Sequence, residues 1–396
     1  MLEHSTLPVR EWKSFLMDIF ICSLGAFGGP EAHYSVFTDQ LVTKKHYLSE
    51  EELVELIALC SFLPGPSSTQ TIVAIGHKTG GPWLAFLTML IWALPALVIM
   101  TILSFLYQFL NNQEISTDIL RYIGPMAVGF IIVASYRIGK KVVKDPLTLF
   151  LLFFGAGITY FIRDPWIFPT VLIAGGLISI LSTKEKDLWN HVKLNPPYPY
   201  LGLFLFFTFG SLLLAILFDN ELIQLFERFY RYGYLVFGGG QVVIPVMYGE
   251  LVEVNQLMSS NEFLTGYGLV QGIPGPMFSF SAYAGGMAAR SGSFLYQTIG
   301  AIVGGVGIFL PGLLLIYFVY PMWEKIKHIK GFKIALRGVA AVAGGLIAIA
   351  AVLLTQQSGL SWDNLLITAV TVLLLSSRKI PAPIIVLIII LIGWLL

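Results

Sequence analysis

The sequence predicts an all-α polytopic membrane protein made of two inverted-topology repeats, with a broken helix in each repeat and a linking span between them. Three observations lead to this prediction. The residues are 56% apolar and only 12% charged, which is typical of a chain that crosses a membrane many times. Pro64-Gly65-Pro66 interrupts an apolar segment, 51–76, that is long enough to span a bilayer. Pro274-Gly275-Pro276 repeats that interruption 210 residues later.

Neither Pro-Gly-Pro sequence can continue a helix, because each proline lacks a backbone donor and clashes with the preceding turn. Each segment therefore predicts two half-helices with non-helical backbone between them. Lipid tolerates such backbone only where protein or water covers it, and paired interruptions in two halves of a chain indicate a transporter binding site. We expect each segment to cross the membrane. The alternative, in which each folds back as a re-entrant hairpin, stays open.

The two halves match in order and spacing. The pairs separated by 210 residues are Phe27-Gly28-Gly29 with Phe237-Gly238-Gly239, and Ser49-x-x-Glu52 with Ser259-x-x-Glu262. Pro30 follows the first of these and Gly240 the second. The Phe-Gly-Gly pairs predict helix ends with close backbone packing, and the Ser-x-x-Glu pairs predict capping boxes that start the broken helices. We therefore expect a first repeat over 1–182, a linker with one span over 183–220, and a second repeat over 221–396, with about six spans in each repeat.

Basic residues orient the halves. Loop 137–146 is basic whereas its counterpart in the second half is not, and the reverse holds for loop 320–333. Opposite positive-inside signals in equivalent loops predict inverted halves, with a cytoplasmic N-terminus and a C-terminus outside. Two features do not fit crossing segments. Lys44 and Lys45 fall outside, and the acidic 240–260 loop falls inside.

The half-helix after Pro66 has the features of an anion site. Its first amides lack partners inside the helix, and the helix dipole places partial positive charge there. Hydroxyl groups add donors, and a glycine permits close backbone approach. Alternatively, the prolines only make a packed kink whose hydroxyls cap locally. The predicted substrate-binding residues are Gly65, Ser67, Ser68, Thr69 and Gln70, with Gly275 and Ser279 in the second half.

Three ionisable residues are candidates for carrying a coupling proton. Asp18 lies inside the first apolar run, where a charge is costly and so often functional. Glu31 and His33 follow the first Phe-Gly-Gly, and histidine titrates near neutral pH. The plain alternatives are a paired Asp18 and a solvated Glu31–His33 loop.

Four basic residues could attract the anion. His77 and Lys78 follow the first broken helix, where they could form a cytoplasmic vestibule or only a positive-inside anchor. Arg121 and Arg337 occupy matching positions, 216 residues apart, where they could contact the anion or only reach the lipid head groups.

Other functional classes receive little support. The formal net charge of +1 gives no support to nucleic-acid binding. The sequence has no Gly-x-Ser-x-Gly, no His-Glu-x-x-His, no P-loop and no metal-spaced Cys/His set, so we expect no enzyme, no cofactor and no metal. Cys22 and Cys60 lie in apolar runs and predict no disulfide.

In its Phe-Gly-Gly and Pro-Gly-Pro motifs the chain resembles the chromate ion transporter family in its long, two-half form. The stretches that carry the resemblance are Phe27-Gly28-Gly29-Pro30-Glu31-Ala32-His33, Ala58-Leu59-Cys60-Ser61-Phe62-Leu63-Pro64-Gly65-Pro66-Ser67-Ser68-Thr69-Gln70, Phe237-Gly238-Gly239-Gly240 and Gln271-Gly272-Ile273-Pro274-Gly275-Pro276. They cover both halves. The resemblance implies oxyanion transport, above all chromate efflux, with sulfate as the chemical look-alike.

The leading hypothesis is thus a secondary transporter in the bacterial inner membrane that moves chromate or a similar oxyanion by alternating access around the broken helices. Its expected partners are the oxyanion and membrane lipid, and coupling to protons stays open. An oxyanion channel, a non-transporting intramembrane enzyme and a scaffold remain alternatives, and the oligomeric state stays open.

Overall fold

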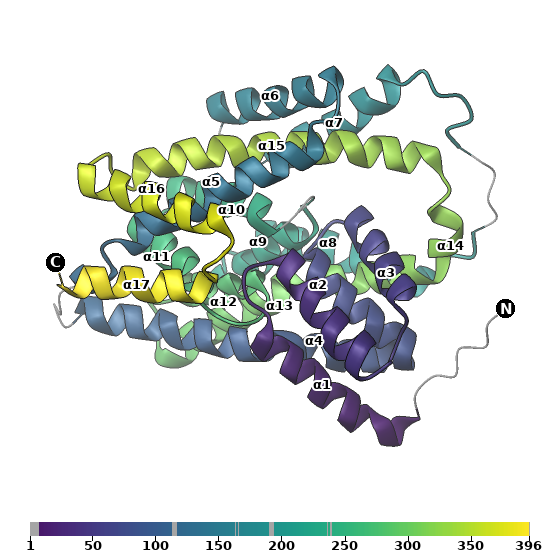
Figure 1. Ribbon diagram of the computed structural model, residues 1–396, viewed down its shortest axis with the longest axis horizontal. Helices are drawn as coiled ribbons and strands as arrows, with labels where there is room; N and C mark the ends of the chain where they lie inside the picture. The colour runs from purple at the N-terminus through teal and green to yellow at the C-terminus, as the bar shows by residue number, and fades with distance from the viewer. Residues whose placement is uncertain are drawn as a thin grey trace.

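The computed structural model describes residues 8–112, 117–162, 164, 166–189, 194–235, 237 and 240–395. Every regular element among these residues is a helix, and no strand occurs in these ranges (Figure 1). Four of the described helices are long and apolar enough to cross a membrane: Ser67–Leu110, Tyr198–Leu217, Phe294–Ile326 and Lys330–Gln357. The chain is an all-α, multi-pass membrane protein.

The helices of the first half begin with short elements and end with long apolar ones. They are α1 (Trp12–Gly25), α2 (Pro30–Phe37), α3 (Glu50–Phe62), α4 (Ser67–Asn112), α5 (Ile123–Val142), α6 (Pro146–Phe161) and α7 (Ile167–Ser182), followed by the linking helix α8 (Tyr198–Leu217).

In the second half, four helices of 6 to 15 residues precede a helix of 26 residues. Its helices are α9 (Glu221–Leu235), α10 (Val243–Tyr248), α11 (Ser260–Val270), α12 (Phe280–Ala288), α13 (Phe294–Val319), α14 (Trp323–Ile326), α15 (Lys330–Gln357), α16 (Trp362–Ser377) and α17 (Ala382–Leu395). A π-helix follows α2 at Thr38–Lys44 and α10 at Gly249–Val254.

Local backbone features recur 210 residues apart. Both predicted capping boxes are confirmed: the Glu52 amide donates to Ser49 Oγ over 3.2 Å, and the Glu262 amide donates to Ser259 Oγ over the same distance. The glycines at the two breaks share an unusual backbone conformation, because Gly65 has φ 125° and Gly275 has φ 105°. Only glycine adopts such angles without strain.

The first broken segment folds back on itself. Lys78 Nζ lies 2.8 Å from Glu52 Oε1, so the start of α3 and the end of the following arm are together. A crossing segment would separate them, because α3 alone, with 13 residues, is about 20 Å long. The chain then reverses again inside α4 at Gly80-Gly81, where the backbone is not helical.

The second broken segment is also a hairpin. Arg290 Nη1 lies 3.1 Å from Glu262 Oε2, which joins the start of α11 to the residues after α12. The expectation that these segments cross the membrane is therefore wrong, and the re-entrant alternative describes the fold. Hydropathy measures only the number of apolar residues. A hairpin that enters and leaves the membrane on one side can contain as many apolar residues as a segment that crosses it.

The two hairpins open at opposite ends of the molecule. The first opens beside α14, where Lys327 Nζ lies 2.5 Å from Glu55 Oε1. We call this the lysine-rich end; it lies at the right of Figure 1, near α3 and α14. The second opens where α4 ends, since Gln108 Nε2 donates to the Arg290 carbonyl over 3.2 Å. This is the opposite end, at the left of Figure 1, near α16 and α17.

Hairpin geometry removes the conflict in the charge pattern. Lys44 and Lys45 immediately precede α3 and so lie at the lysine-rich end. The acidic π-helix Gly249–Val254 immediately precedes α11 and belongs to the opposite end. In a crossing arrangement both would be on the wrong side.

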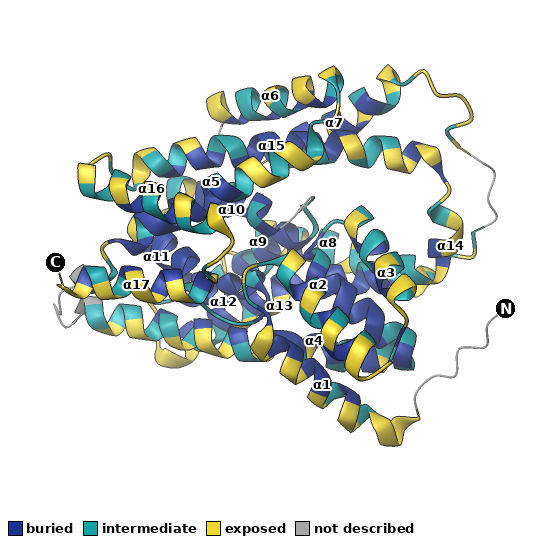
Figure 2. Ribbon diagram, in the orientation of Figure 1, coloured by how far each residue is buried: buried dark blue, intermediate teal, exposed yellow. Residues whose placement is uncertain are grey.

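Burial follows the membrane environment. Figure 2 shows buried residues concentrated around α12 and α13, and exposed residues along the outer sides of α6 and α17. The linking helix α8 exposes large apolar side chains, among them Phe206 and Phe209. Apolar side chains on the outside suit contact with lipid, whereas the buried interior carries the polar groups considered next.

Candidate functional site

The second Pro-Gly-Pro break contacts the first half of the chain. The Gly275 amide donates to the Ala26 carbonyl over 2.8 Å, so the second break contacts the loop that carries the first Phe-Gly-Gly. A Cβ on Gly275 would lie 3.1 Å from Ala96 Cβ, which is tighter than an ordinary van der Waals contact. Gly65 and Gly275 are both buried. The halves are therefore joined through their structure-breaking residues.

Buried polar side chains lie beside the first break. Ser68 Oγ lies 2.9 Å from His33 Nδ1, and Trp92 Nε1 donates to Thr69 Oγ1 over 3.1 Å. The His33 and Trp92 rings pack edge to face with centroids 5.3 Å apart. Ser23 Oγ donates to the Trp92 carbonyl over 2.8 Å. We call His33, Ser68, Thr69 and Trp92 the central cluster.

Gln70 closes the loop at the first break. Its Nε2 donates to the Pro64 carbonyl over 2.8 Å and also lies 2.8 Å from where a Cβ on Gly65 would be. Gln70 Oε1, His33 Nε2 and Ser279 Oγ are buried, and no described protein group hydrogen-bonds to them. Buried polar atoms normally have partners, so these three have capacity for a ligand or water.

The candidate coupling residues separate into different environments. His33 is buried in the central cluster, whereas Glu31 is exposed. Asp18 is paired, as the plain alternative expected. It accepts hydrogen bonds from Gln40 over 2.9 Å and Tyr47 over 2.7 Å, and Lys45 Nζ lies 3.2 Å away.

The four basic candidates lie away from the breaks. His77 packs against Tyr320 with ring centroids 4.9 Å apart, and Lys78 is held by Glu52. Arg121 pairs with Asp363 over 2.6 Å at the opposite end. Hydrogen bonding by Ser361, together with Arg121, lowers the pKa of Asp363 below its ordinary value.

Arg337 forms an ion pair with Asp145, which caps α6. The Thr148 amide and hydroxyl, and then Arg337, lower the pKa of Asp145. The predicted helix end is present, because α1 ends at Gly25 before Phe27-Gly28-Gly29 and Pro30 begins α2. The expected close backbone packing is not found at Gly28 and Gly29, where an added Cβ would meet nothing within 4 Å. Phe237 packs on the core, while Gly238 and Gly239 lie outside the described residues.

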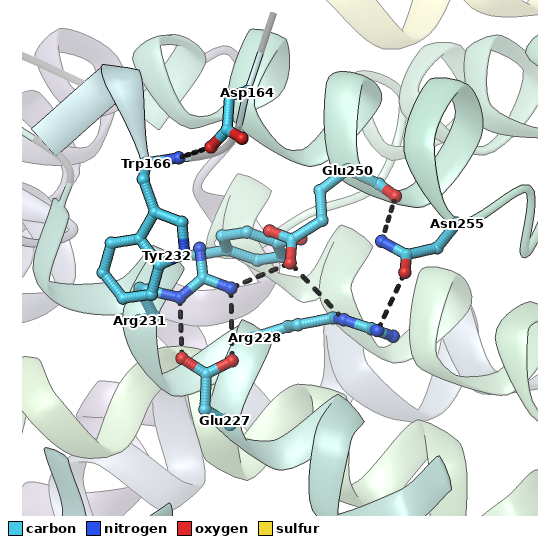
Figure 3. Close-up of polar contacts among 8 residues, drawn as sticks. All are labelled: Asp164, Trp166, Glu227, Arg228, Arg231, Tyr232, Glu250 and Asn255. Carbon is cyan, nitrogen blue, oxygen red and sulfur yellow. Dashed lines mark hydrogen bonds and ion pairs between the residues drawn. The ribbon is translucent and has the colours of Figure 1, made fainter. Parts of the chain in front are cut away.

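A buried charged network was missed by sequence reasoning (Figure 3). Arg231 binds Glu227 through Nε over 2.7 Å and Glu250 through Nη2 over 2.8 Å. Arg228 Nε lies 3.4 Å from Glu250, and the Tyr232 hydroxyl donates to the same carboxylate over 2.8 Å. The available signal was the Glu227–Arg231 spacing of four residues in a helix that also carries Arg228.

This network occupies the positions equivalent to Asp18 and its partner. Arg228 follows Asp18 by 210 residues, and Glu250 follows Gln40 by 210 residues. In both halves, a charged residue on the first helix contacts a polar residue on or beside the π-helix. We infer that these contacts hold each Phe-Gly-Gly hairpin together.

The contacts beside the first break are made by hydrogen-bonding side chains and not by charged pairs. Within the described ranges, no group of three or more His, Cys, Asp or Glu side chains could hold a metal ion. The residues near the breaks are hydroxyls, amides, an imidazole and an indole, which can donate hydrogen bonds to oxygen atoms of an anion.

Comparisons with known proteins give the family. The family model described as chromate transporter matches residues 13–180 and 223–394. A probable chromate transport protein of Synechococcus elongatus is 27% identical over 93% of this chain and 92% of its own length. A chromate transport protein of Cupriavidus metallidurans is 25% identical over 96% of this chain and 92% of its own length.

An uncharacterized transporter of Methanocaldococcus jannaschii is 25% identical over 92% of this chain and 90% of its own length. No solved structure matches the chain. The match in both halves, with relatives that span nearly the whole sequence, makes this protein a membrane transporter and not an enzyme. The chain belongs to the chromate transporter family.

Proposed function

We propose that this protein carries chromate, or a similar tetrahedral oxyanion, out across the bacterial inner membrane by alternating access. One observation carries the proposal: the Gly275–Ala26 hydrogen bond brings the second break against the first half, beside the central cluster. The names of the Synechococcus and Cupriavidus relatives support chromate as the substrate. Breaks that meet inside a bundle suit a transporter, because only there can irregular backbone face a solute.

The proposal includes an inverted repeat. The first hairpin opens at the lysine-rich end and the second at the opposite end, as two copies of one unit would if inserted in opposite senses. The lysine-rich end is assigned to the cytoplasm by the positive-inside tendency. The N-terminus is then cytoplasmic and the C-terminus outside, with repeats over 1–182 and 221–396 and a linker over 183–220.

The anion is proposed to bind at the start of the arm that follows Pro66. That arm supplies free first-turn amides and the hydroxyls of Ser67, Ser68 and Thr69. In the present conformation Ser68 and Thr69 are occupied by His33 and Trp92. Binding would turn these hydroxyls, and the side chains that hold them, toward the oxyanion. The proposed set also includes Gly65, Gln70, Gly275 and Ser279.

Charge favours the outward direction. An inside-negative potential assists export by about 2.3 kcal/mol per charge per 100 mV, hence by about 4.6 kcal/mol for a dianion. His33 is the proposed proton carrier, because its Nε2 is buried without a partner whereas Glu31 is exposed and Asp18 is paired.

Uptake of chromate into inverted membrane vesicles tests the site. The double variant Ser68→Ala, Thr69→Ala removes two hydroxyl donors with little change in volume, and we expect at least about tenfold slower uptake. Ser61→Ala is the matched control, because Ser61 is exposed and bonds only to its own helix. Wild-type rates in a well-expressed double variant would remove the site assignment.

A further inference from the structure

A polar cavity of about 290 Å³ lies at the opposite end of the molecule, between the two halves. The first half contributes Tyr107, Arg121 and Gly124 to its wall, and the second half contributes Asn261, Thr265 and Asn364. Since one water needs only about 10–15 Å³ of such space, the cavity has room for a small anion with part of its hydration shell. It is separate from the central cluster.

Three helices begin at this cavity. Gly124 is the second residue of α5, Asn261 the second of α11, and Asn364 the third of α16. No side chain caps the start of α5 or of α16. The positive dipole ends of these helices therefore lie at the wall of one cavity, where they add to the potential that a dianion would experience. At α11 the Glu262 amide already donates to Ser259 Oγ.

Two carboxylates near the cavity, those of Asp363 and Glu262, are each paired with an arginine in this structure. Asp363 is held by Arg121 over 2.6 Å and receives the Tyr122 hydroxyl over 3.4 Å. Glu262 is held by Arg290 over 3.1 Å. The Arg121 side chain is 55% exposed, so its guanidinium is free to change partners.

The remaining polar side chains of the wall carry no charge. Tyr107 and Thr265 have hydroxyls, and Asn261 has an amide, whereas the Asn364 amide already donates to the Ser358 carbonyl over 2.7 Å. From the cavity, α11 runs toward the second break: its 11 residues span about 16 Å, and Pro274 follows four residues after its last residue, Val270.

We propose that this cavity is a second oxyanion-binding site, an outer vestibule in which Arg121 leaves Asp363 and binds a partly hydrated tetrahedral dianion. The role of the vestibule in transport rests on the proposed function above. Arginine suits this exchange, because its planar fork binds carboxylate and tetrahedral oxyanions in the same two-pronged way. Because both halves line the cavity, occupancy would also depend on their relative position.

Binding of radiolabelled sulfate, which does not oxidise the protein, tests the site in the purified full-length chain. All variants are made in the Ser68→Ala, Thr69→Ala background, so that the central cluster does not contribute. Arg121→Gln should weaken sulfate binding by about tenfold or more, the value of one charged hydrogen-bonding group. Asp363→Asn removes the competing carboxylate and should strengthen binding several-fold.

Arg137→Gln is the matched control, because Arg137 is an exposed arginine of α5 near its other end, where it donates to the Leu375 carbonyl. It should bind sulfate like the background protein. Arg121→Lys keeps the charge and loses the fork, so it should fall between the background and Arg121→Gln. If Arg121→Gln does not fold, the sulfate affinity of Arg121→Lys tests the proposal in its place.

Two results would overturn the vestibule. One is equal sulfate affinity in the Arg121 and Arg137 variants. The other is weaker binding in Asp363→Asn, which would make the ion pair structural. Neither result affects the central cluster. The converse result is that the Ser68→Ala, Thr69→Ala protein transports chromate at the wild-type rate while the Arg121 variants still bind sulfate more weakly. That combination would contradict the proposed transport site and leave the vestibule supported.

Discussion

The Gly275 amide donates a hydrogen bond to the Ala26 carbonyl over 2.8 Å, and this contact joins the two halves at their structure-breaking loops. Both broken segments of the chain are hairpins that turn back inside the molecule. The backbone groups at such turns have no partner within a helix. Inside the protein, those of one turn can hydrogen-bond to those of another.

Substitution of Gly275 tests how closely these loops pack. Gly275→Ala forces a side chain into a φ of 105° and places Cβ 3.1 Å from Ala96 Cβ. We expect a loss of about 1–3 kcal/mol in unfolding free energy, measured by thermal unfolding in detergent. Gly202→Ala is the control, because a Cβ there meets nothing within 4 Å and should be neutral or slightly stabilising. Equal effects would contradict the packing.

Labelling of introduced cysteines distinguishes hairpins from crossing segments. Lys44 and Val254 are exposed positions separated by 210 residues, and the hairpin fold places them at opposite ends. In intact cells, a membrane-impermeant maleimide should label Val254→Cys, whereas Lys44→Cys should react only after permeabilisation. The native Cys22 and Cys60 are buried and give a low background. The reverse pattern is the one that crossing segments require.

Removal of Arg231 should strongly destabilise the protein. The side chain is 4% exposed and binds both Glu227 and Glu250, so Arg231→Met leaves two buried carboxylates without their main partner. We expect a loss of about 3–5 kcal/mol. Asp39→Asn, which breaks the exposed Lys44 pair, should cost no more than about 1 kcal/mol. Thermal unfolding of both variants measures the difference, and similar losses would argue against a buried network.

A proton carried by His33 predicts a specific change in pH response. Burial lowers the pKa of His33 to about 4. His33→Gln keeps a hydrogen-bonding group beside Ser68 but cannot titrate, so chromate uptake should lose its dependence on pH between about 3 and 5. Glu31→Gln should keep the wild-type profile, because Glu31 is exposed outside the cluster. Uptake assays across this pH range decide the matter. An unchanged profile in His33→Gln would exclude this residue as the carrier.

Local features of the fold could be predicted from the sequence. The capping boxes at Ser49 and Ser259, the helix end before Phe27 and the interruption at Pro64 follow from short-range chemistry, and the structure has all four. Short-range rules work here because the partners lie within a few residues of one another.

The path of the chain through the membrane could not be predicted in the same way. The apolar content of 51–76 fits a span or a hairpin equally well, and only the misplaced Lys44 and Lys45 indicated the hairpin. Sequence reasoning did not predict that Trp92 belongs to the central cluster, because it contacts Thr69, which lies 23 residues earlier in the chain. Likewise, Glu250 meets Arg231 only once the π-helix packs against α9.

Thermal unfolding of the purified protein with chromate tests the central claim most directly. A ligand at 100 times its dissociation constant adds about 2.7 kcal/mol to the stability of the protein that binds it. We predict that chromate raises the unfolding temperature of the wild type, and that Ser68→Ala, Thr69→Ala loses most of this rise while Ser61→Ala keeps it. An equal rise in all three proteins would contradict oxyanion binding at the first break.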